Sequence, residues 1–220
     1  MRTDPDLAFE RELWRGGLTY VAGLDEAGRG ALAGPVAVGA VILPREAIRA
    51  PGLRRVRVSN LKNSFDLLRG VRDSKQMTPR QREAAAPRIK QMAVAWSVGF
   101  ASPEEIDSQG IVQAVRLAAL RALHDLGIYP DYLLTDFRLE LPELDVCQTA
   151  LVRGDARCLS IAAASILAKT ARDALMRDLD KQVPGYELAR HKGYGTRAHR
   201  LALQRLGHSA IHRQTFSVKP

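Results

Sequence analysis

The glycine-rich segment between two apolar runs is the part of the sequence that most restricts the possible folds. Residues 19–24 and 35–43 are short and rich in apolar and β-branched side chains, which is typical of buried strands. Between them, residues 28–33 read GRGALA and match the GxGxxG/A pattern of dinucleotide-binding folds. That pattern requires a helix directly after the turn, and Gly34-Pro35 stops any helix there. The segment therefore favours an antiparallel hairpin over a strand–helix–strand unit.

The remaining elements alternate between helices and strands. Asp4-Pro5 is expected to cap and begin a short helix that ends at Gly16-Gly17. Thr78-Pro79 and Ser102-Pro103 are helix starts of the same kind. Further helices are expected over 110–126, 160–181 and 197–206, and further strands over 93–100, 132–135 and 146–149. The expected fold class is α/β, a mixed β-sheet flanked by helices, with a small helical C-terminal appendage.

Positive charge is concentrated in two parts of the chain, which has a net charge of +9. Residues 44–72 contain eight basic and two acidic residues, and residues 182–220 contain seven and one, so each cluster carries +6. Two such clusters beside a body of opposite net charge predict a polyanionic partner such as nucleic acid. Solvated surfaces that only aid solubility are the alternative. We interpret residues 44–72 as a basic insertion, whose role the sequence leaves open.

Membrane insertion and secretion are not expected. The longest apolar runs, such as 36–43 and 161–168, are far shorter than the roughly 20 residues of a membrane-spanning helix. The first residues carry charges throughout, unlike a signal peptide. Cys147 and Cys158 form no CxxC pair and are expected to be reduced and buried. The expected location is therefore the cytoplasm.

Histidines gather near the end of the chain, at positions 191, 199, 208 and 212. His208 and His212 have the spacing of zinc ligands on a helix. However, Gly207 undermines a helix there and no cysteine lies nearby. We therefore expect surface or phosphate-facing histidines.

Four acidic residues stand where strands end or a helix begins. Asp25 and Glu26 follow the first strand, Asp136 ends the strand over 132–135, and Asp155 precedes the long helix. Neighbouring strand residues face opposite ways, so the pair can be a solvated strand end, although the following glycines supply a bend that lets both face one site. Oxygen ligands suit Mg²⁺, and two such ions can hold the attacking and leaving oxygens of a phosphodiester. Acids beside basic loops thus indicate metal-dependent phosphodiester cleavage.

Longer motifs carry a resemblance to a known family. They are GLDEAGRG at 23–30, GPV at 34–36, DSK at 73–75, EID at 105–107, GD at 154–155, AAASILAK at 162–169, RD at 172–173, HKGYGT at 191–196 and HR at 212–213. In this order, over about residues 20–218, they resemble the signatures of bacterial ribonuclease HII, the type 2 ribonuclease H. The resemblance implies a ribonuclease H-like catalytic domain over 1–181 and a substrate-binding appendage over 182–220.

The resemblance also implies an activity. The protein would be a monomeric endonuclease that cuts the RNA strand of RNA–DNA hybrids and cuts 5′ of single ribonucleotides in duplex DNA. It would use Mg²⁺ or Mn²⁺ and leave a 5′-phosphate and a 3′-hydroxyl. The implied metal-binding, catalytic carboxylates are Asp25, Glu26, Asp136 and Asp155.

Substrate-binding residues follow from the same motifs. Gly28, Arg29 and Gly30 would approach the ribose 2′-hydroxyl through their backbone, and Tyr194 would stack on the neighbouring deoxyribose. The implied phosphate contacts, each of which can also be an ordinary surface charge, are Lys75, Lys169, Arg172 and Lys192. Asp173 is expected to be exposed or paired along its helix.

The chain departs from the family pattern in two places. Phe137 follows the third acid where the family usually has Gly, and a bulky neighbour can move the carboxylate of Asp136. Residues 108–110 read SQG where the family usually has Asn. A non-catalytic nucleic-acid-binding protein with the same fold is the rival interpretation. Residues 216–220 contain no clear sliding-clamp motif.

Overall fold

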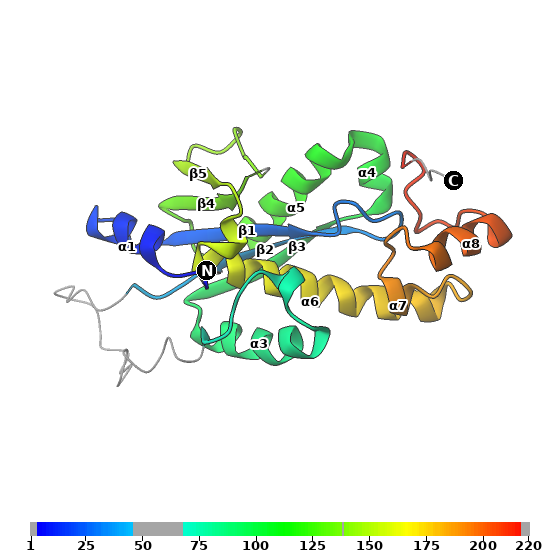
Figure 1. The fold of residues 1–220 in the computed structure, drawn as a ribbon. Coiled ribbons are helices and arrows are strands. Elements are labelled where there is room, and N and C mark those ends of the chain that lie inside the picture. Colours follow the sequence, from blue (N-terminus) through cyan, green and yellow to red (C-terminus); the bar gives the residue numbers. More distant parts are fainter. Residues whose placement is uncertain (1–3, 46–67, 138, 217–220) are drawn as a thin grey trace.

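A mixed five-stranded sheet forms the centre of the molecule, in the order β3-β2-β1-β4-β5 (Figure 1). The computed structural model describes residues 4–45, 68–137 and 139–216. The strands are β1 (Val21–Ala27), β2 (Val36–Ile42), β3 (Ala95–Ala101), β4 (Tyr132–Asp136) and β5 (Gln148–Leu151). The first three pair antiparallel, while β1–β4 and β4–β5 pair parallel. The expected hairpin and mixed sheet are both confirmed.

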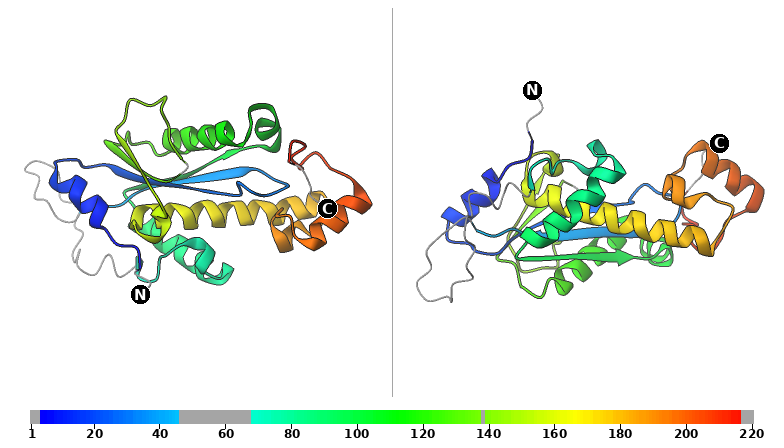
Figure 2. Two further views of the ribbon diagram at one scale, coloured as in Figure 1. Left: turned by 45° about the horizontal axis from the view of Figure 1, so that its top comes forward. Right: turned by 90° about the horizontal axis from the view of Figure 1, so that it is seen from below.

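Helices cover both faces of the sheet (Figures 1 and 2). One face packs against α6 (Leu159–Gln182), which α3 (Pro79–Met92) supports from outside. The other packs against α5 (Ile111–Asp125), which follows α4 (Pro103–Gln109). The other helices of the described residues are α1 (Ala8–Arg15), α7 (Leu188–His191) and α8 (Arg197–Leu206), together with the 3₁₀ turns η2 (Ser74–Gln76) and η3 (Gly154–Ala156).

Strand glycines allow α6 to lie unusually close to the sheet. A Cβ atom at Gly23 would collide with the backbone of Ser160, and one at Gly39 would collide with the backbone of Ala164. The facing part of α6 is the alanine-rich run 162–164, which is fully buried. Small residues on both surfaces therefore bring the start of α6 directly over β1 and β2, which is the region that holds the first acid pair.

Helix starts agree with the sequence at α3 and α4. Thr78 and Gln81 form a reciprocal capping box at α3, and Ser102 and Glu105 form one at α4. The predicted start of the first helix is wrong, because α1 begins at Ala8 and not after Asp4. The reason is a bridge of Asp6 to Cys158, in which the Asp6 carbonyl accepts the Leu159 N–H at 2.9 Å.

The C-terminal segment packs at the far end of α6 (Figure 2). Its small apolar core contains Tyr186, Leu188 and Leu203. Ala33 from the glycine-rich loop and Met176 from α6 complete that core. The segment is thus joined to the sheet domain through the loop that follows β1.

Two further expectations have different outcomes. Cys158 is buried as predicted, but Cys147 is exposed, since it lies just before the edge strand β5; both are free thiols. Across 4–45, 68–137 and 139–216, no helix has the length and hydropathy needed to cross a membrane.

Candidate active site

The acidic residues meet at the end of β1, where that strand extends past its neighbour β4. The strand was predicted to stop at Leu24, but it continues to Ala27, so Asp25 and Glu26 lie within it. The parallel pairing with β4 ends at Leu24 opposite Thr135, which leaves the following residues of β1 with an open edge on that side. Asp136 is the last residue of β4, level with this open edge.

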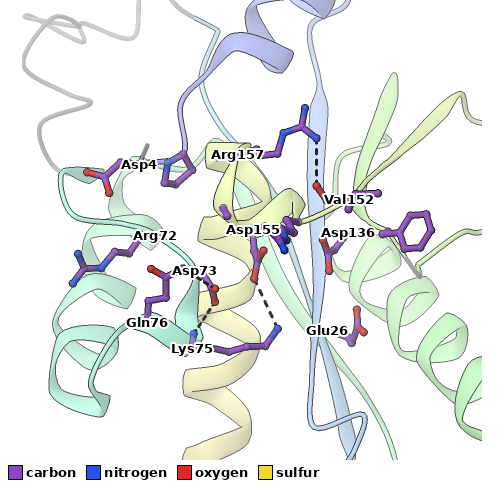
Figure 3. A pocket seen from close by; sticks show the side chains of 14 residues that line it. Asp4, Glu26, Arg72, Asp73, Lys75, Gln76, Asp136, Val152, Asp155 and Arg157 are labelled. Atoms are coloured by element: carbon purple, nitrogen blue, oxygen red, sulfur yellow. Dashed lines mark hydrogen bonds and ion pairs between the residues drawn. The ribbon is translucent and has the colours of Figure 1, made fainter. Parts of the chain in front are cut away.

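A cavity of about 960 Å³ opens at this edge (Figure 3). Glu26, Asp136 and Asp155 line it from three different elements, which are β1, β4 and η3. The other polar side chains around it are Asp4, Arg72, Asp73, Lys75, Gln76, Arg153 and Arg157. The cavity therefore combines a carboxylate floor with basic groups, as the sequence predicted for the end of β1.

Asp25 and Glu26 are held in environments that disfavour their charge. Asp25 is buried, and its Oδ1 accepts the Glu26 N–H at 2.7 Å. Burial, and then the charge of Glu26, raise the pKa of Asp25 well above its ordinary value. Burial also raises the pKa of Glu26, against the opposing charge of Arg29, whose Nη1 lies 3.6 Å from Glu26 Oε1.

Asp136 and Asp155 are fixed by the turn that begins α6. Asp136 Oδ1 accepts the Gly154 N–H at 2.8 Å. A side chain at Gly154 would press on Ile161 and on that carboxylate, so glycine keeps the contact open. Burial, followed by the charge of Asp73, raises the pKa of Asp155 to about 6, and the Lys75 Nζ stands 3.9 Å from its Oδ2.

These residues fit a divalent cation by their chemistry. Every candidate ligand is a carboxylate, and Glu26 Oε2 is buried without a hydrogen-bond partner among the described residues. Within the same residues, no three His, Cys, Asp or Glu side chains are already clustered tightly enough to hold an ion.

Carboxylates at the adjoining ends of β1 and β4, with basic side chains around them, define a metal-dependent phosphodiester hydrolase on a ribonuclease H-like sheet. A family model described as Ribonuclease HII matches residues 22–219. Ribonuclease HII of Dehalococcoides mccartyi is 46% identical over 97% of this chain and 93% of its own, and that of Moorella thermoacetica is 48% identical over 98% and 95%. The chain belongs to the ribonuclease HII family, whose members are metal-dependent endoribonucleases that cleave the RNA strand of RNA–DNA hybrids.

Solved structures agree on the fold. Ribonuclease H2 from Pyrococcus horikoshii superposes with a TM-score of 0.68 at 24% identity, over 90% of this chain and 94% of that one. The RNase HII in a PCNA complex from Archaeoglobus fulgidus gives a TM-score of 0.70 at 22% identity, over 91% and 96%. The expected ribonuclease H-like architecture is therefore confirmed.

The structure brings the two expected sugar-reading elements together. The loop 28–33 follows β1, and its Ala31 forms an isolated bridge with Tyr194. The Leu32 N–H also donates to the Gly193 carbonyl at 2.8 Å. Gly28 is buried whereas Gly30 is exposed, so the loop turns from the interior to the surface beside Tyr194.

The four expected phosphate contacts lie in different environments. Lys75 is exposed beside the cavity, and Lys192 is half-buried with its Nζ donating to the Ala189 carbonyl. Lys169 Nζ lies 5.0 Å from the centre of the Tyr194 ring. Arg172 is a correction, because it is fully buried and all three of its nitrogens donate to backbone carbonyls rather than facing solvent.

Asp173, the next residue on the same helix, was expected to be either exposed or paired along the helix. Its pairing along the helix is confirmed by Lys169, whose Nζ lies 2.7 Å from Oδ1. It is buried rather than exposed, because Arg82 on α3 reaches its Oδ2 at 3.2 Å. Asp173 therefore joins two helices.

The histidines of the C-terminal segment are a second correction. His208 is exposed as expected, but His191, His199 and His212 are buried in one cluster. His212 Nδ1 accepts the Ser209 N–H, so its Nε2 hydrogen points at His199 Nε2, 3.1 Å away. His199 Nδ1 then donates to the Tyr194 carbonyl at 3.1 Å. The spacing of these histidines in the sequence does not indicate that they are linked by hydrogen bonds in the fold.

Arg213 lies next to the candidate site, but the sequence analysis assigned no role to it. Its motif, HR at 212–213, was noted only as part of the resemblance. In the structure it is fully buried against the loop that follows β1. Arginine is rarely buried without a partner, so no composition signal points to such a position.

Proposed function

We propose that this chain cuts the RNA strand of hybrids, and also cuts 5′ of single ribonucleotides in duplex DNA, at the site formed by the buried Asp25 together with Glu26, Asp136 and Asp155, which line the cavity. The observation that carries the proposal is the direct contact between the loop 28–33 and Tyr194. A backbone that reads a 2′-hydroxyl, next to a ring that packs on a sugar, suits a ribonucleotide followed by a deoxyribonucleotide.

The four carboxylates are the proposed ligands of Mg²⁺ or Mn²⁺. Such ions, when bound, supply the positive charge that activates water and stabilises the leaving 3′-oxygen of the phosphodiester. An all-oxygen ligand set and the unpartnered Glu26 Oε2 support a hard cation. A related fold, Bst-RNase HIII, has been crystallised with Mn²⁺, with a TM-score of 0.63 at 19% identity.

The side chains around the metal ligands have proposed roles in positioning the substrate. Lys75, exposed at the cavity, is placed to bind a phosphate beside Asp155. Gly28, Arg29 and Gly30 are proposed to meet the ribose, and Tyr194 the following deoxyribose. Lys169, whose Nζ lies 5.0 Å from the centre of that ring, and Lys192, two residues before Tyr194, are proposed to contact the adjoining backbone.

The proposal includes an organisation for the whole chain. Residues 1–181 are the catalytic domain and residues 182–220 are a substrate-binding appendage, supported by the shared core of Ala33 with Tyr186 and Leu203. We propose that the protein acts as a monomer. We place it in the cytoplasm, where free thiols such as Cys147 and Cys158 persist.

The proposal is tested with three labelled duplexes of one sequence, which are a continuous hybrid, DNA with one ribonucleotide, and plain DNA. With Mg²⁺ or Mn²⁺ we expect cleavage of the first two and none of the third. Tyr194→Ala should reduce cleavage at the single ribonucleotide more than it reduces binding, because phosphate contacts supply most of the affinity. Cleavage of the hybrid alone would overturn junction recognition, and cleavage of none would favour the non-catalytic rival.

Asp25→Asn tests the metal site itself. A neutral amide at this buried position removes an anionic ligand, so the cleavage rate should fall by several orders of magnitude. Duplex binding and thermal unfolding should stay near the parent values. Asp178→Asn, an exposed acid on α6, is the matched control and should keep full activity. Near-parent turnover of Asp25→Asn at low Mg²⁺ would contradict the assignment.

A further inference from the structure

We propose that Arg213 is a positioning residue that turns the backbone N–H groups of Arg29 and Gly30 toward the ribose 2′-hydroxyl. This inference rests on the proposed function and deepens it, because it names the donors that read the sugar and the side chain that orients them. Arg213 contacts only the protein, on the interior side of the loop.

Three hydrogen bonds tie Arg213 to the glycine-rich segment 28–34. Its Nη2 donates to the Gly28 carbonyl at 2.8 Å and its Nη1 to the Arg29 carbonyl at 2.9 Å. Its Nε donates to the Gly34 carbonyl at 3.0 Å. A guanidinium presents its donors in a fixed planar fork, so the directions of these three carbonyls are set together.

The orientation of the N–H groups follows from the geometry of the peptide unit. The described residues contain no cis peptide bond, and in a trans peptide the C=O and the following N–H point in opposite directions. The Gly28 and Arg29 carbonyls point inward at Arg213, so the N–H groups of Arg29 and Gly30 point outward. A Cβ placed on Gly30 would meet nothing within 4 Å, so this side of the loop is open to a substrate.

Arg213 is itself held in place on both sides. Its own N–H donates to the Leu32 carbonyl at 2.9 Å. Asp107 on α4 accepts the next two backbone N–H groups, from Gln214 at 2.8 Å and Thr215 at 3.0 Å. The segment around Arg213 is therefore anchored to both the loop and α4, and the guanidinium has little freedom to move.

The charge of Arg213 strengthens these bonds. Burial, and then the neighbouring charge of Arg172, lower its pKa to about 9, which leaves the guanidinium protonated at neutral pH. Carbonyls that accept from a charged donor are polarised, and their N–H groups become better donors on the opposite side. A ribose oxygen can accept from such donors, whereas a deoxyribose offers no oxygen at that position.

The test is a binding measurement in Asp25→Asn, which is expected to hold substrate without cutting it. The dissociation constants of two duplexes are compared, one with a single ribonucleotide and one of plain DNA. We expect Asp25→Asn, the parent of this comparison, to bind the ribonucleotide duplex with a dissociation constant about tenfold lower than that for plain DNA, which is the effect of one or two hydrogen bonds. Adding Arg213→Lys should reduce this ratio to about one and leave the affinity for plain DNA unchanged, because an ammonium cannot hold three carbonyls in one plane.

Two further variants separate this role from a general loss of structure. Arg205→Lys makes the same exchange on α8, where Arg205 donates to the Gly185 carbonyl, and should keep the full ratio. Asp107→Asn weakens the hydrogen bonds from Gln214 and Thr215 and leaves the Arg213 guanidinium intact, so it should lower the ratio of the two dissociation constants only in part. If thermal unfolding shows that Arg213→Lys is not folded, the Asp107→Asn variant provides the test: a lowered ratio supports the role of Arg213, and an unchanged ratio contradicts it.

A tenfold ratio that persists in a folded Arg213→Lys would overturn the role of Arg213 and leave the proposed function intact. A parent without any ribonucleotide preference would overturn backbone reading of the 2′-hydroxyl, and Arg213's role with it, even where hybrid cleavage persists. The two failures are therefore distinguishable in the same experiment.

Discussion

At the scale of single residues, position 28 meets two demands that only glycine satisfies together. Its φ angle is +91°, a region that side chains rarely adopt, and a Cβ there would collide with the buried guanidinium of Arg172. That guanidinium donates to the carbonyls of Ala33, Pro35 and Lys192. Gly28 is thus a packing requirement of the loop as well as a turn residue.

Gly28→Ala should lower the free energy of unfolding by about 2–4 kcal/mol, since backbone strain and a displaced buried arginine add to each other. Gly70→Ala is the matched control, because its φ is +82° with open space around the new Cβ, so only the strain of about 1 kcal/mol remains. Urea unfolding of both variants measures the difference. Equal losses in the two variants would show that Arg172 does not restrict position 28.

At the scale of secondary-structure elements, α1 supplies a buried acid to the start of α6. Glu10 is fully buried, and its Oε1 accepts the Ser160 N–H at 2.8 Å. Cys158 Sγ also donates to it at 3.2 Å. A carboxylate at a helix N-terminus satisfies a free N–H and interacts favourably with the helix dipole. The start of α6, which follows the η3 turn that carries Asp155, is therefore anchored by a helix far away in sequence.

Glu10→Gln should destabilise the fold by about 1–2 kcal/mol, because the amide keeps one acceptor but loses the charge and buries an NH₂ group. Glu12→Gln, on the exposed side of the same helix, should change stability by less than about 0.5 kcal/mol. Chemical denaturation measures both. A Glu10→Gln protein as stable as the parent would contradict the anchoring role.

At the scale of the whole molecule, the sequence patterns predicted those features that depend on residues close together in the chain. The hairpin, the helix starts at Thr78 and Ser102 and the position of Asp136 at the end of β4 follow from periodicity, turn residues and caps. The buried Arg213 and the histidine cluster did not follow, because their partners lie on distant segments. The start of α1 failed for the same reason, since a bridge to Cys158 overrides the local signal of Asp4-Pro5.

The histidine cluster links the stability of the molecule to pH. Burial lowers the pKa of His191, His199 and His212, in the last case to about 4. A histidine whose folded pKa lies below the unfolded value of about 6.5 stabilises the fold above pH 6.5. That stabilisation is lost as the pH falls from about 6.5 toward 4, because the unfolded chain then binds the proton more readily.

His212→Asn removes one titrating member and should flatten this dependence. The stability difference between parent and variant should shrink by about 1.4 kcal/mol per pH unit below pH 6.5. Urea unfolding between pH 7.5 and 5 measures the two slopes. His208→Asn, at the exposed histidine of the same segment, should retain the parent's slope. If the free energy of unfolding varies with pH to the same extent in the parent and in His212→Asn, His212 does not contribute to the pH dependence.

The bond between Arg213 and Gly28 joins residues 185 positions apart. The ribosome synthesises the glycine-rich segment long before it synthesises Arg213. Throughout most of translation the growing chain therefore contains this segment without the side chain that orients it. The last of the four proposed metal ligands is Asp155, whereas Tyr194 and Arg213, which we propose take part in reading the sugar, are synthesised later. During translation the chain therefore completes the set of proposed metal ligands before the residues that we propose select the substrate.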